Sequence, residues 1–101
     1  MLMQRFEKTV DNKVVAQVIL YVLEDVVENR RPAGYIHQVQ THKDHRRNGY
    51  ATELVKQALK KAKAMNCYKC FLICDQKLVP LYKGAGMELQ QGEVCMVTRF
   101  A

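Results

Sequence analysis

The hydrophobic pattern of this chain changes its period at Tyr50, and this change constrains the fold more than any other feature. From there on, apolar residues recur at the spacing of one helical face. They are Ala51, Leu54, Val55, Ala58, Leu59, Ala62 and Met65. The pattern predicts an amphipathic helix over residues 50–65, and Asn66 is suited to end it in the left-handed conformation.

Strands are expected before this helix. Residues 5–9 and 13–23 are strand-like runs on either side of turn chemistry at 10–12. Residues 28–33 are polar and contain a proline, which indicates a loop. Residues 34–41 have the composition of another strand, which leads towards the helix.

Further elements are expected after the helix. Residues 67–74 form a nearly continuous apolar run, which predicts a central strand buried on both faces. A proline opens a short helix over 80–83, and residues 87–90 and 93–100 are expected to pair as a hairpin. This order is typical of an α/β or α+β sheet with helices packed on it. The length allows one domain, residues 1–101.

The composition gives no sign of a membrane span. Hydrophobic residues make up 49% of the chain, which supports a packed core. The longest apolar run, 14–27, contains polar and acidic residues and is shorter than the roughly 18 apolar residues that a spanning helix needs. The N-terminus lacks the apolar segment of a secretory signal. We therefore expect no membrane partner.

The four cysteines are candidate metal ligands, because Cys67 and Cys70 have C-x-x-C spacing. In a strand, however, side chains three residues apart point to opposite faces. Neither a second C-x-x-C pair nor a His pair follows to complete a set of four ligands. We therefore expect no metal site, and reduced thiols in a cytoplasmic protein.

The segment before the helix is basic and contains a glycine. Four of the five residues 43–47 are basic or can become so, and the whole chain carries a formal charge of +6. Cations disfavour the positive end of a helix dipole, whereas the free N–H groups there bind anions. The amides of residues 47–51 could thus hold a phosphate. The other interpretation is that these side chains point into solvent and Gly49 only makes the turn. Both stay open on the local pattern.

The segment Arg46-Arg47-Asn48-Gly49-Tyr50-Ala51 matches R/Q-x-x-G-x-G/A, the acetyl-CoA pyrophosphate loop of GNAT acetyltransferases. Residues 66–75 and 79–87 resemble two further segments of eukaryotic glucosamine-6-phosphate N-acetyltransferases. The resemblance runs from about Arg5 to Arg99, which is most of the chain.

This resemblance implies a GNAT-like fold, in which a mixed central sheet splays apart at residues 34–41 and acetyl-CoA lies in the opening. It also implies one long and one short helix. Tyr82 takes the position of the tyrosine that protonates the departing CoA thiolate, a role that its O–H suits. The other interpretation of Tyr82 is packing of the short helix against the sheet. The residues that would bind the cofactor are Val39, Gln40, Thr41, Arg46, Arg47, Asn48, Gly49, Tyr50 and Ala51.

The sequence departs from this family mainly at the acceptor site. Two adjacent acids of the family correspond to His37-Gln38, and a third acid corresponds to Ile73. Leu78 takes the place of an asparagine. Basic residues of the family align with Asp25 and Glu28, which would repel a phosphate. By this resemblance the chain begins where the second strand of the family would begin, and the first strand and its helices would be missing.

Some acceptor positions are retained. Tyr68, Lys69 and Arg99 match substrate-contact positions of the family. His37 is a candidate base in place of the lost acids, because a neutral imidazole can take a proton from an ammonium. The other interpretation is that His37 is an ordinary histidine of the strand, with its hydrogen bonds satisfied and no catalytic role.

We therefore expect an acetyl-CoA-dependent N-acetyltransferase, with an aminosugar phosphate such as glucosamine 6-phosphate as its small-molecule amine acceptor. The alternative is a catalytically degenerate GNAT protein that binds CoA or acts as an interaction subunit. The resemblance also implies a homodimer. A nucleic-acid partner is disfavoured, because the aromatic residues fall in apolar strand and helix patterns.

Overall fold

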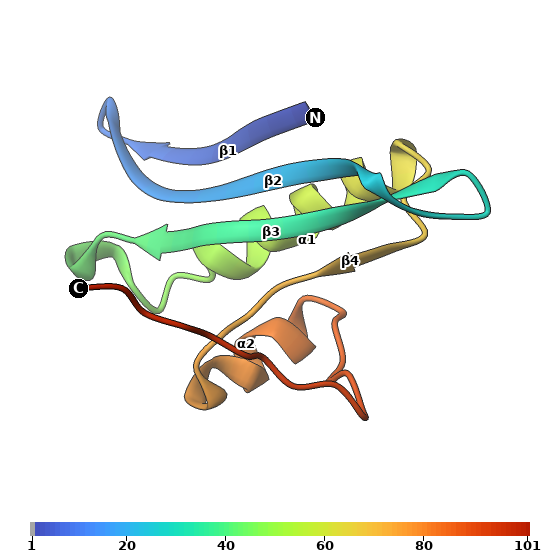
Figure 1. The fold of residues 1–101 in the computed structure, drawn as a ribbon. Coiled ribbons are helices and arrows are strands. Elements are labelled where there is room, and N and C mark those ends of the chain that lie inside the picture. Colours follow the sequence, from blue (N-terminus) through green and yellow to red (C-terminus); the bar gives the residue numbers. More distant parts are fainter. Residues whose placement is uncertain (1) are drawn as a thin grey trace.

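The protein is built on one mixed four-stranded sheet. The computed structural model describes residues 2–101, and for residues 25–27 it describes the backbone only. Strands β1 (Leu2–Val10), β2 (Lys13–Glu28) and β3 (Arg31–Thr41) are antiparallel neighbours. Strand β4 (Lys69–Phe71) pairs in parallel with β3, which gives the order β1-β2-β3-β4 (Figure 1).

Two tight turns connect the antiparallel strands. Asp11 and Asn12 have φ of 51° and 66°, and Asn29 and Arg30 have φ of 52° and 63°. Positive φ at both central residues is the geometry of the type I′ hairpin, which follows the twist of the strands. The first turn confirms the expectation at 10–12.

The predicted loop at 28–33 is wrong, because β2 continues to Glu28 and β3 begins at Arg31. The proline in this stretch lies where the pairing of the two strands is irregular. Leu23 pairs with Ala33 and Glu28 pairs with Arg31, so β2 advances five residues there while β3 advances two. A proline is tolerated at such a place, since its missing N–H breaks no regular ladder.

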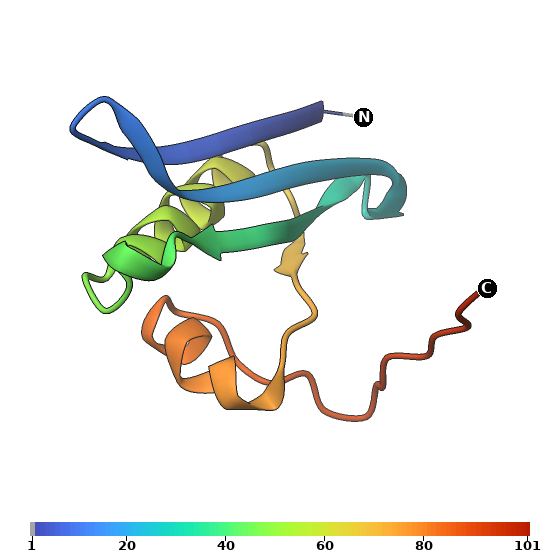
Figure 2. The ribbon, with the colours of Figure 1, turned by 90° about the vertical axis from the view of Figure 1, so that its left-hand side faces the viewer.

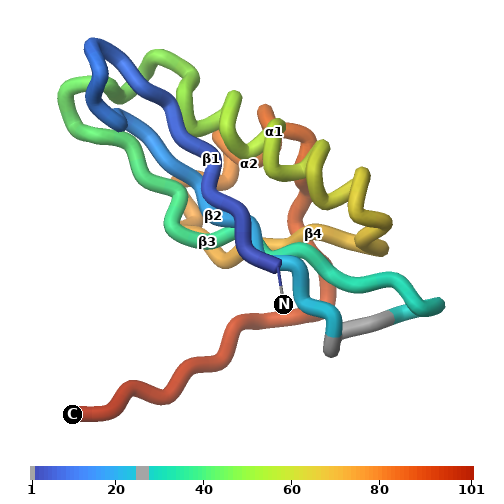
Figure 3. The backbone as a smooth tube through the Cα atoms, turned by 90° about the horizontal axis from the view of Figure 1, so that it is seen from above, coloured from blue at the N-terminus to red at the C-terminus, as the bar shows by residue number. Residues whose placement is uncertain are grey.

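Helix α1 (Tyr50–Ala64) packs on one face of the sheet (Figure 3). The predicted stripe is confirmed, because Leu54, Val55, Ala58 and Ala62 are buried. Gly34 allows a close approach. A Cβ there would lie 3.1 Å from Cys70 Sγ and 3.3 Å from Ala62 Cβ. The core joins helix and strands through Ala16, Val18, Leu20, Val22, Ile36, Leu54, Val55, Ala58, Ala62, Cys67, Tyr82 and Ala85.

The end of α1 is a complete Schellman motif. Asn66 has φ of 64°, as expected for a left-handed terminator. Its N–H donates to Lys63 O at 3.0 Å, and the N–H of Cys67 donates to Ala62 O at 3.1 Å. These are the two hydrogen bonds that define the motif.

The central strand predicted at 67–74 is wrong. Strand β4 contains only three residues, and it lies at the edge of the sheet. It pairs with residues 33–35 of β3, and Ile73 beyond it is 63% exposed. A run of apolar residues indicates that the segment is buried, but it does not show whether another strand pairs with it on each side.

The short helix is confirmed, whereas the C-terminal hairpin is wrong. Helix α2 (Val79–Gly84) has its proline in the first turn and follows the 3₁₀ turn Gln76–Leu78. Residues 85–101 form no strand, and the last part of this segment extends away from the sheet (Figure 2). Val94, Met96 and Phe100 are 87%, 88% and 90% exposed. Alternating apolar residues form a strand only where a partner strand is available.

Among the residues described, no helix is both long and apolar enough to cross a membrane.

Replacing Asn66 with alanine is expected to lower the free energy of unfolding by about 1 kcal/mol, because the Cβ of alanine is strained in the left-handed region. Asn66→Gly is the matched control and should be at least as stable as the wild type. Urea unfolding followed by circular dichroism measures both. Equal losses in the two variants would contradict the assignment.

Candidate functional site

The sheet opens between β3 and β4. The two strands pair only at residues 33–35 and 69–71, and β3 then continues to Thr41 without β4 beside it. Two hollows lie at this opening. The larger hollow, of about 1140 Å³, extends over the segment before α1, and the smaller hollow, of about 260 Å³, lies between β3 and residues 72–75. Both are lined by Val39, Gln40, Leu78 and Tyr82, so they meet at the opening.

A β-bulge lies in β3 at this opening. Gln40 pairs with Gln17 and His37 pairs with Ile19. Between these two pairs β3 advances three residues while β2 advances two. Gln38 has φ of 54°, which is rare for a residue that is not glycine. Gln38 and Val39 have no register partner on β2. Bulges of this kind redirect a strand and recur beside active sites.

The loop before α1 presents unused N–H groups. Arg47 and Gly49 have φ of 66° and 76°, and Gly49 is the N-cap without a side-chain cap. Within residues 2–101, no backbone N–H from Arg46 to Thr52 donates to another protein group. The first helical hydrogen bond runs from Glu53 N to Gly49 O at 3.0 Å. These amides form a concave donor site for an anion.

The loop is held in place by its own side chains. Arg46 Nε donates to Thr41 O at 3.3 Å, and Asn48 Nδ2 donates to His45 O at 3.1 Å. The 3₁₀ turn Lys43–His45 precedes the loop, and His42 Nδ1 accepts from the N–H of Asp44 at 3.2 Å. These contacts order the loop without using its amides.

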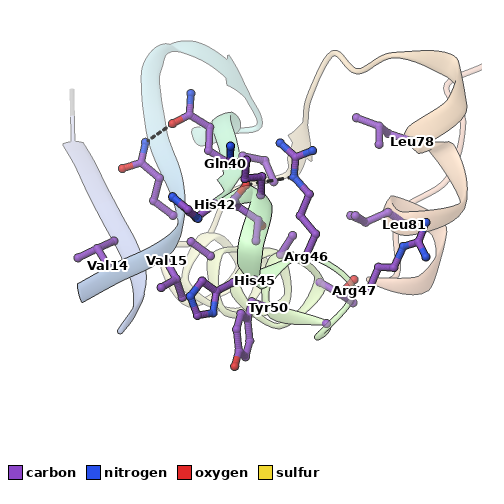
Figure 4. Close-up of a pocket in the computed structure, with 18 of the residues that line it drawn as sticks. Val14, Val15, Gln40, His42, His45, Arg46, Arg47, Tyr50, Leu78 and Leu81 are labelled. Atoms are coloured by element: carbon purple, nitrogen blue, oxygen red, sulfur yellow. Dashed lines mark hydrogen bonds between the residues drawn. The ribbon is translucent and has the colours of Figure 1, made fainter. Parts of the chain in front are cut away.

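The charge around the loop is mainly positive. Arg46 and Arg47 are exposed and line the larger hollow. Figure 4 shows them on the side nearer Leu81, with His42 and His45 on the side nearer Val15. The first turn of α1 contains one acid, Glu53, which lies 3.9 Å from Lys8 Nζ and is therefore partly neutralised. An anion on the loop would relieve the repulsion between the arginines and the helix dipole.

Tyr82 lies where the two hollows meet. It is 8% exposed and belongs to the core in which α2 contacts α1. Burial raises the pKa of its hydroxyl, and the charge of a Cys74 thiolate would raise it further. Among the described residues, no side chain or backbone group forms a hydrogen bond with this hydroxyl. Its oxygen is not fully buried, so it remains accessible. Tyr82 thus keeps its proton at neutral pH and lines both hollows.

The expected acceptor residues are not all brought together. His37 is exposed on β3 and lines the smaller hollow. Lys69 begins the edge strand β4, and its Nζ lies 5.5 Å from the ring centroid of Tyr68, the residue before the strand. Arg99 lies in the exposed C-terminal segment and lines neither hollow. The side chain of Asp25 lies outside the described residues.

The cysteines form no disulfide in the described chain. All four are free, and burial raises the pKa of the Cys70 thiol to about 12. No group of three His, Cys, Asp or Glu side chains in the described part of the chain could hold a metal ion.

Some of the lining residues were not expected from the sequence. Val14 and Val15 of β2, with Leu81 of α2, form apolar walls of the larger hollow. Leu78 lines both hollows. Their apolar character marked them only as core or strand residues. The bulge at Gln38 has no signal in the sequence, because neither glycine nor proline marks it.

The chain is similar to known acetyltransferases. Residues 5–87 match the model of the acetyltransferase (GNAT) family. Among solved structures, a candidate acetyltransferase from Agrobacterium tumefaciens has a TM-score of 0.85 at 26% identity, over 97% of this chain and 69% of that one. No curated protein matches the chain.

Two further structures show the same fold at lower identity. Glucosamine-6-phosphate N-acetyltransferase from Arabidopsis thaliana has a TM-score of 0.83 at 23% identity, over 94% of this chain and 63% of that one. A predicted acetyltransferase from Clostridium acetobutylicum, solved with acetyl-CoA, has a TM-score of 0.80 at 21% identity, over 95% and 64%. The chain thus spans 63% to 69% of the lengths of these three structures.

Replacing Gly49 with alanine is expected to weaken the binding of a diphosphate ligand such as ADP by about 10-fold or more. The residue has φ of 76°, and a Cβ there would meet no protein atom within 4 Å. The variant is therefore strained at the loop that presents the amides. Calorimetry measures the affinity.

Gly86→Ala is the matched control, because Gly86 also has positive φ and open space around it but lines neither hollow. It should lose some stability and keep its affinity. If both variants bound as tightly as the wild type, the loop would not be the anion site.

Proposed function

The chain belongs to the GNAT family of acetyltransferases, and from this premise we propose that it is an acetyl-CoA-dependent N-acetyltransferase. Its mixed four-stranded sheet with two helices is a GNAT-like fold. The observation that carries the proposal is the row of unused amides from Arg46 to Thr52 beside the opening of the sheet.

The larger hollow fits the cofactor in shape and in chemistry. Amides of residues 46–51 would hold the diphosphate, with Arg46 and Arg47 adding charge-assisted hydrogen bonds. Gly49 leaves the space above the loop free. Backbone groups of residues 39–41, beyond the bulge, would pair with the pantetheine arm. These are the assignments expected from the sequence, and the geometry supports them.

The residues at the opening suit direct transfer to an amine. Bound acetyl-CoA supplies the acetyl group as a thioester. His37 would take the proton from the incoming ammonium, so that the neutral nitrogen forms the new C–N bond. Backbone donors at the bulge would stabilise negative charge on the carbonyl oxygen. As the C–S bond breaks, Tyr82 would donate its proton to the leaving sulfur, and the second proton lost by the nitrogen would return to the tyrosine oxygen, while the proton on His37 would pass to solvent.

An aminosugar phosphate such as glucosamine 6-phosphate is our proposed acceptor. Tyr68 and Lys69 support it, because Lys69 begins the edge strand β4, Tyr68 directly precedes it, and Lys69 supplies a cation. Arg99 would contribute only if the C-terminal segment came to this edge.

One observation favours the alternative of a degenerate GNAT protein that binds CoA without turnover. Among the described residues that line the two hollows, the one carboxylate is Asp75, and its Oδ1 already accepts from Lys77 N at 2.9 Å. His37 is then the candidate base of the smaller hollow. Binding of CoA with no acetylation of any amine would select this alternative.

A homodimer and a cytoplasmic location complete the proposal. The exposed apolar residues of the C-terminal segment and the edge position of β4 support pairing between two chains. The four free cysteines support a reducing compartment.

Tyr82→Phe is expected to lower kcat by about 100-fold, the usual scale for loss of a general acid, and to leave the Kd for CoA unchanged. Thiol release with glucosamine 6-phosphate measures turnover, and calorimetry measures Kd. No binding of CoA or acetyl-CoA by the folded protein would refute the proposed function.

The pH profile gives an independent readout. Because burial raises the pKa of Tyr82 above the ordinary value of about 10, the hydroxyl stays protonated below that value and loses its proton above it. The kcat of the wild type should therefore be steady at neutral pH and fall only above about pH 10. In Tyr82→Phe this alkaline decrease should disappear, and its persistence would exclude Tyr82 as the acid.

The dimer is tested by light scattering at micromolar concentration. We expect the mass of two chains, and a shift to one chain in the double variant Val94→Asp, Met96→Asp. Both side chains are exposed in the single chain, so the charges cost the monomer little. A wild-type monomer would refute the dimer.

A further inference from the structure

One thiol lies in the smaller hollow. Cys74 lines this hollow, which lies between β3 and residues 72–75. Leu72 and Cys74 pack against the core, whereas Ile73 between them is 63% exposed. The side chain of Cys74 therefore points inwards, towards the part of the core that contains Tyr82.

A hydroxyl without a protein partner lies at the same place. Tyr82 is 8% exposed and lines both hollows, and no group of the described residues forms a hydrogen bond with its hydroxyl. Because the core encloses the ring, the accessible part of this hydroxyl faces the hollows. Burial raises its pKa, and the charge of a Cys74 thiolate raises it further, so the two side chains are close. A buried donor of this kind indicates that a ligand supplies the acceptor.

The other thiols of the chain are not placed in this way. Among the described residues that line the two hollows, Cys74 is the one cysteine, and the smaller hollow contains no lysine. Cys67 is buried, and burial raises the pKa of Cys70 to about 12, so that Cys70 keeps its proton. Cys95 is exposed. A reactive carbonyl group at the opening of the sheet would therefore meet Cys74 and not the other three.

We propose that Cys74 is a self-acetylation site, at which the thiol takes the acetyl group of bound acetyl-CoA when no amine occupies the smaller hollow. This activity rests on the proposed function, which places the thioester at the opening. Cys74 and His37 line the same hollow, so the thiol has a base to take its proton. Tyr82 supplies the acid for the leaving sulfur.

The step exchanges one thioester for another. The sulfur of Cys74 forms a bond to the carbonyl carbon as the C–S bond to CoA breaks, and the CoA thiol is released. The proton of Cys74 passes to His37, Tyr82 gives its proton to the CoA sulfur, and the proton on His37 returns to the tyrosine oxygen. Because the same kind of bond breaks and forms, the extent of acetylation follows the ratio of acetyl-CoA to free CoA.

The acetyl group on Cys74 occupies part of a small space. The smaller hollow has a volume of about 260 Å³, and His37, the base for the incoming amine, lines it. The acetylated thiol therefore excludes the amine until free CoA takes the acetyl group back. An excess of acetyl-CoA over CoA thus restrains the transfer reversibly.

The wild-type protein is tested by incubation with acetyl-CoA in the absence of an amine, followed by tryptic digestion and mass spectrometry. Fragmentation of the peptide 70–77 separates Cys74 from Cys70, and Cys95 lies in another peptide. We expect Cys74 to be acetylated at least about 10-fold faster than Cys95, because the bound thioester is held beside one thiol. Hydroxylamine, which cleaves thioesters and not amides, should remove the acetyl group, and so should an excess of free CoA.

A small acetyl thioester is the matched reagent. The acetyl thioester of N-acetylcysteamine has the same reacting group as acetyl-CoA but no diphosphate for the loop before α1. With this reagent the preference for Cys74 should disappear, because Cys95 is exposed and Cys74 is half-buried. The two reagents thus separate delivery by the bound cofactor from the reactivity of the thiols themselves.

Two glycine variants test delivery from the side of the protein. At limiting acetyl-CoA, Gly49→Ala should slow the acetylation of Cys74 by the same factor by which it weakens the binding of CoA, and it should leave the rate at Cys95 unchanged. Gly86→Ala is the matched control and should change neither rate, since Gly86 lines neither hollow.

The outcomes separate this activity from the proposed function. Equal rates at Cys74 and Cys95 with acetyl-CoA would overturn it, and so would a preference for Cys74 that persists with the small thioester. If the folded protein binds CoA and acetylates amines but gains no acetyl group on Cys74, then Cys74 is not the site and the proposed function stands. Failure to bind CoA would instead refute the proposed function. The comparison of reagents uses the wild-type chain, so it stays decisive if a variant does not fold.

Discussion

The short parallel contact between β3 and β4 is the constraint on which the rest of the structure depends. It contains only three residue pairs, with Gly34 opposite Cys70 at its centre. The missing side chain of Gly34 lets Ala62 of α1 approach this point closely. Sheet and helix are thus fixed together at one place, while β3 and the following segment are free to diverge. The opening, the two hollows and the position of Tyr82 all follow from this divergence.

The loop before α1 is locally unfavourable in the isolated chain. Its amides have no protein partner, and its arginines lie near the positive end of the helix. Local rules would favour an acid cap at Gly49 and neutral residues before it. Departures of this kind are expected where a site is built for a ligand, because the ligand supplies the missing charge and the missing acceptors. The loop is nevertheless ordered, because the side chains of Arg46 and Asn48 donate hydrogen bonds to the backbone before it.

Much of the fold could be predicted from the sequence because it is local. The stripe of α1, the terminator Asn66 and the proline of α2 each depend on neighbours within a few residues, and all three are confirmed. Two of the three wrong predictions concern pairing between distant segments, and the third, the loop at 28–33, is a local hairpin. The run at 67–74 and the C-terminal residues have strand composition, but composition does not determine whether another strand lies alongside.

The site divides in the same way. The loop of residues 46–51 lies in one continuous segment, so its motif can be recognised from the sequence alone. The bulge at Gln38 and the alignment of Tyr21, Tyr35 and Phe71 arise only when β2, β3 and β4 are brought into register. No spacing along the chain links Tyr21, Tyr35 and Phe71.

This difference bears on what relatives can share. A cradle made of main-chain donors needs a glycine and a backbone shape but few particular side chains. It can therefore persist at the 21% to 26% identity seen with solved acetyltransferases. A surface made of side chains from three strands changes whenever one of them is replaced. The fold and the loop thus indicate the cofactor, whereas the acceptor has to be inferred from this chain's own side chains.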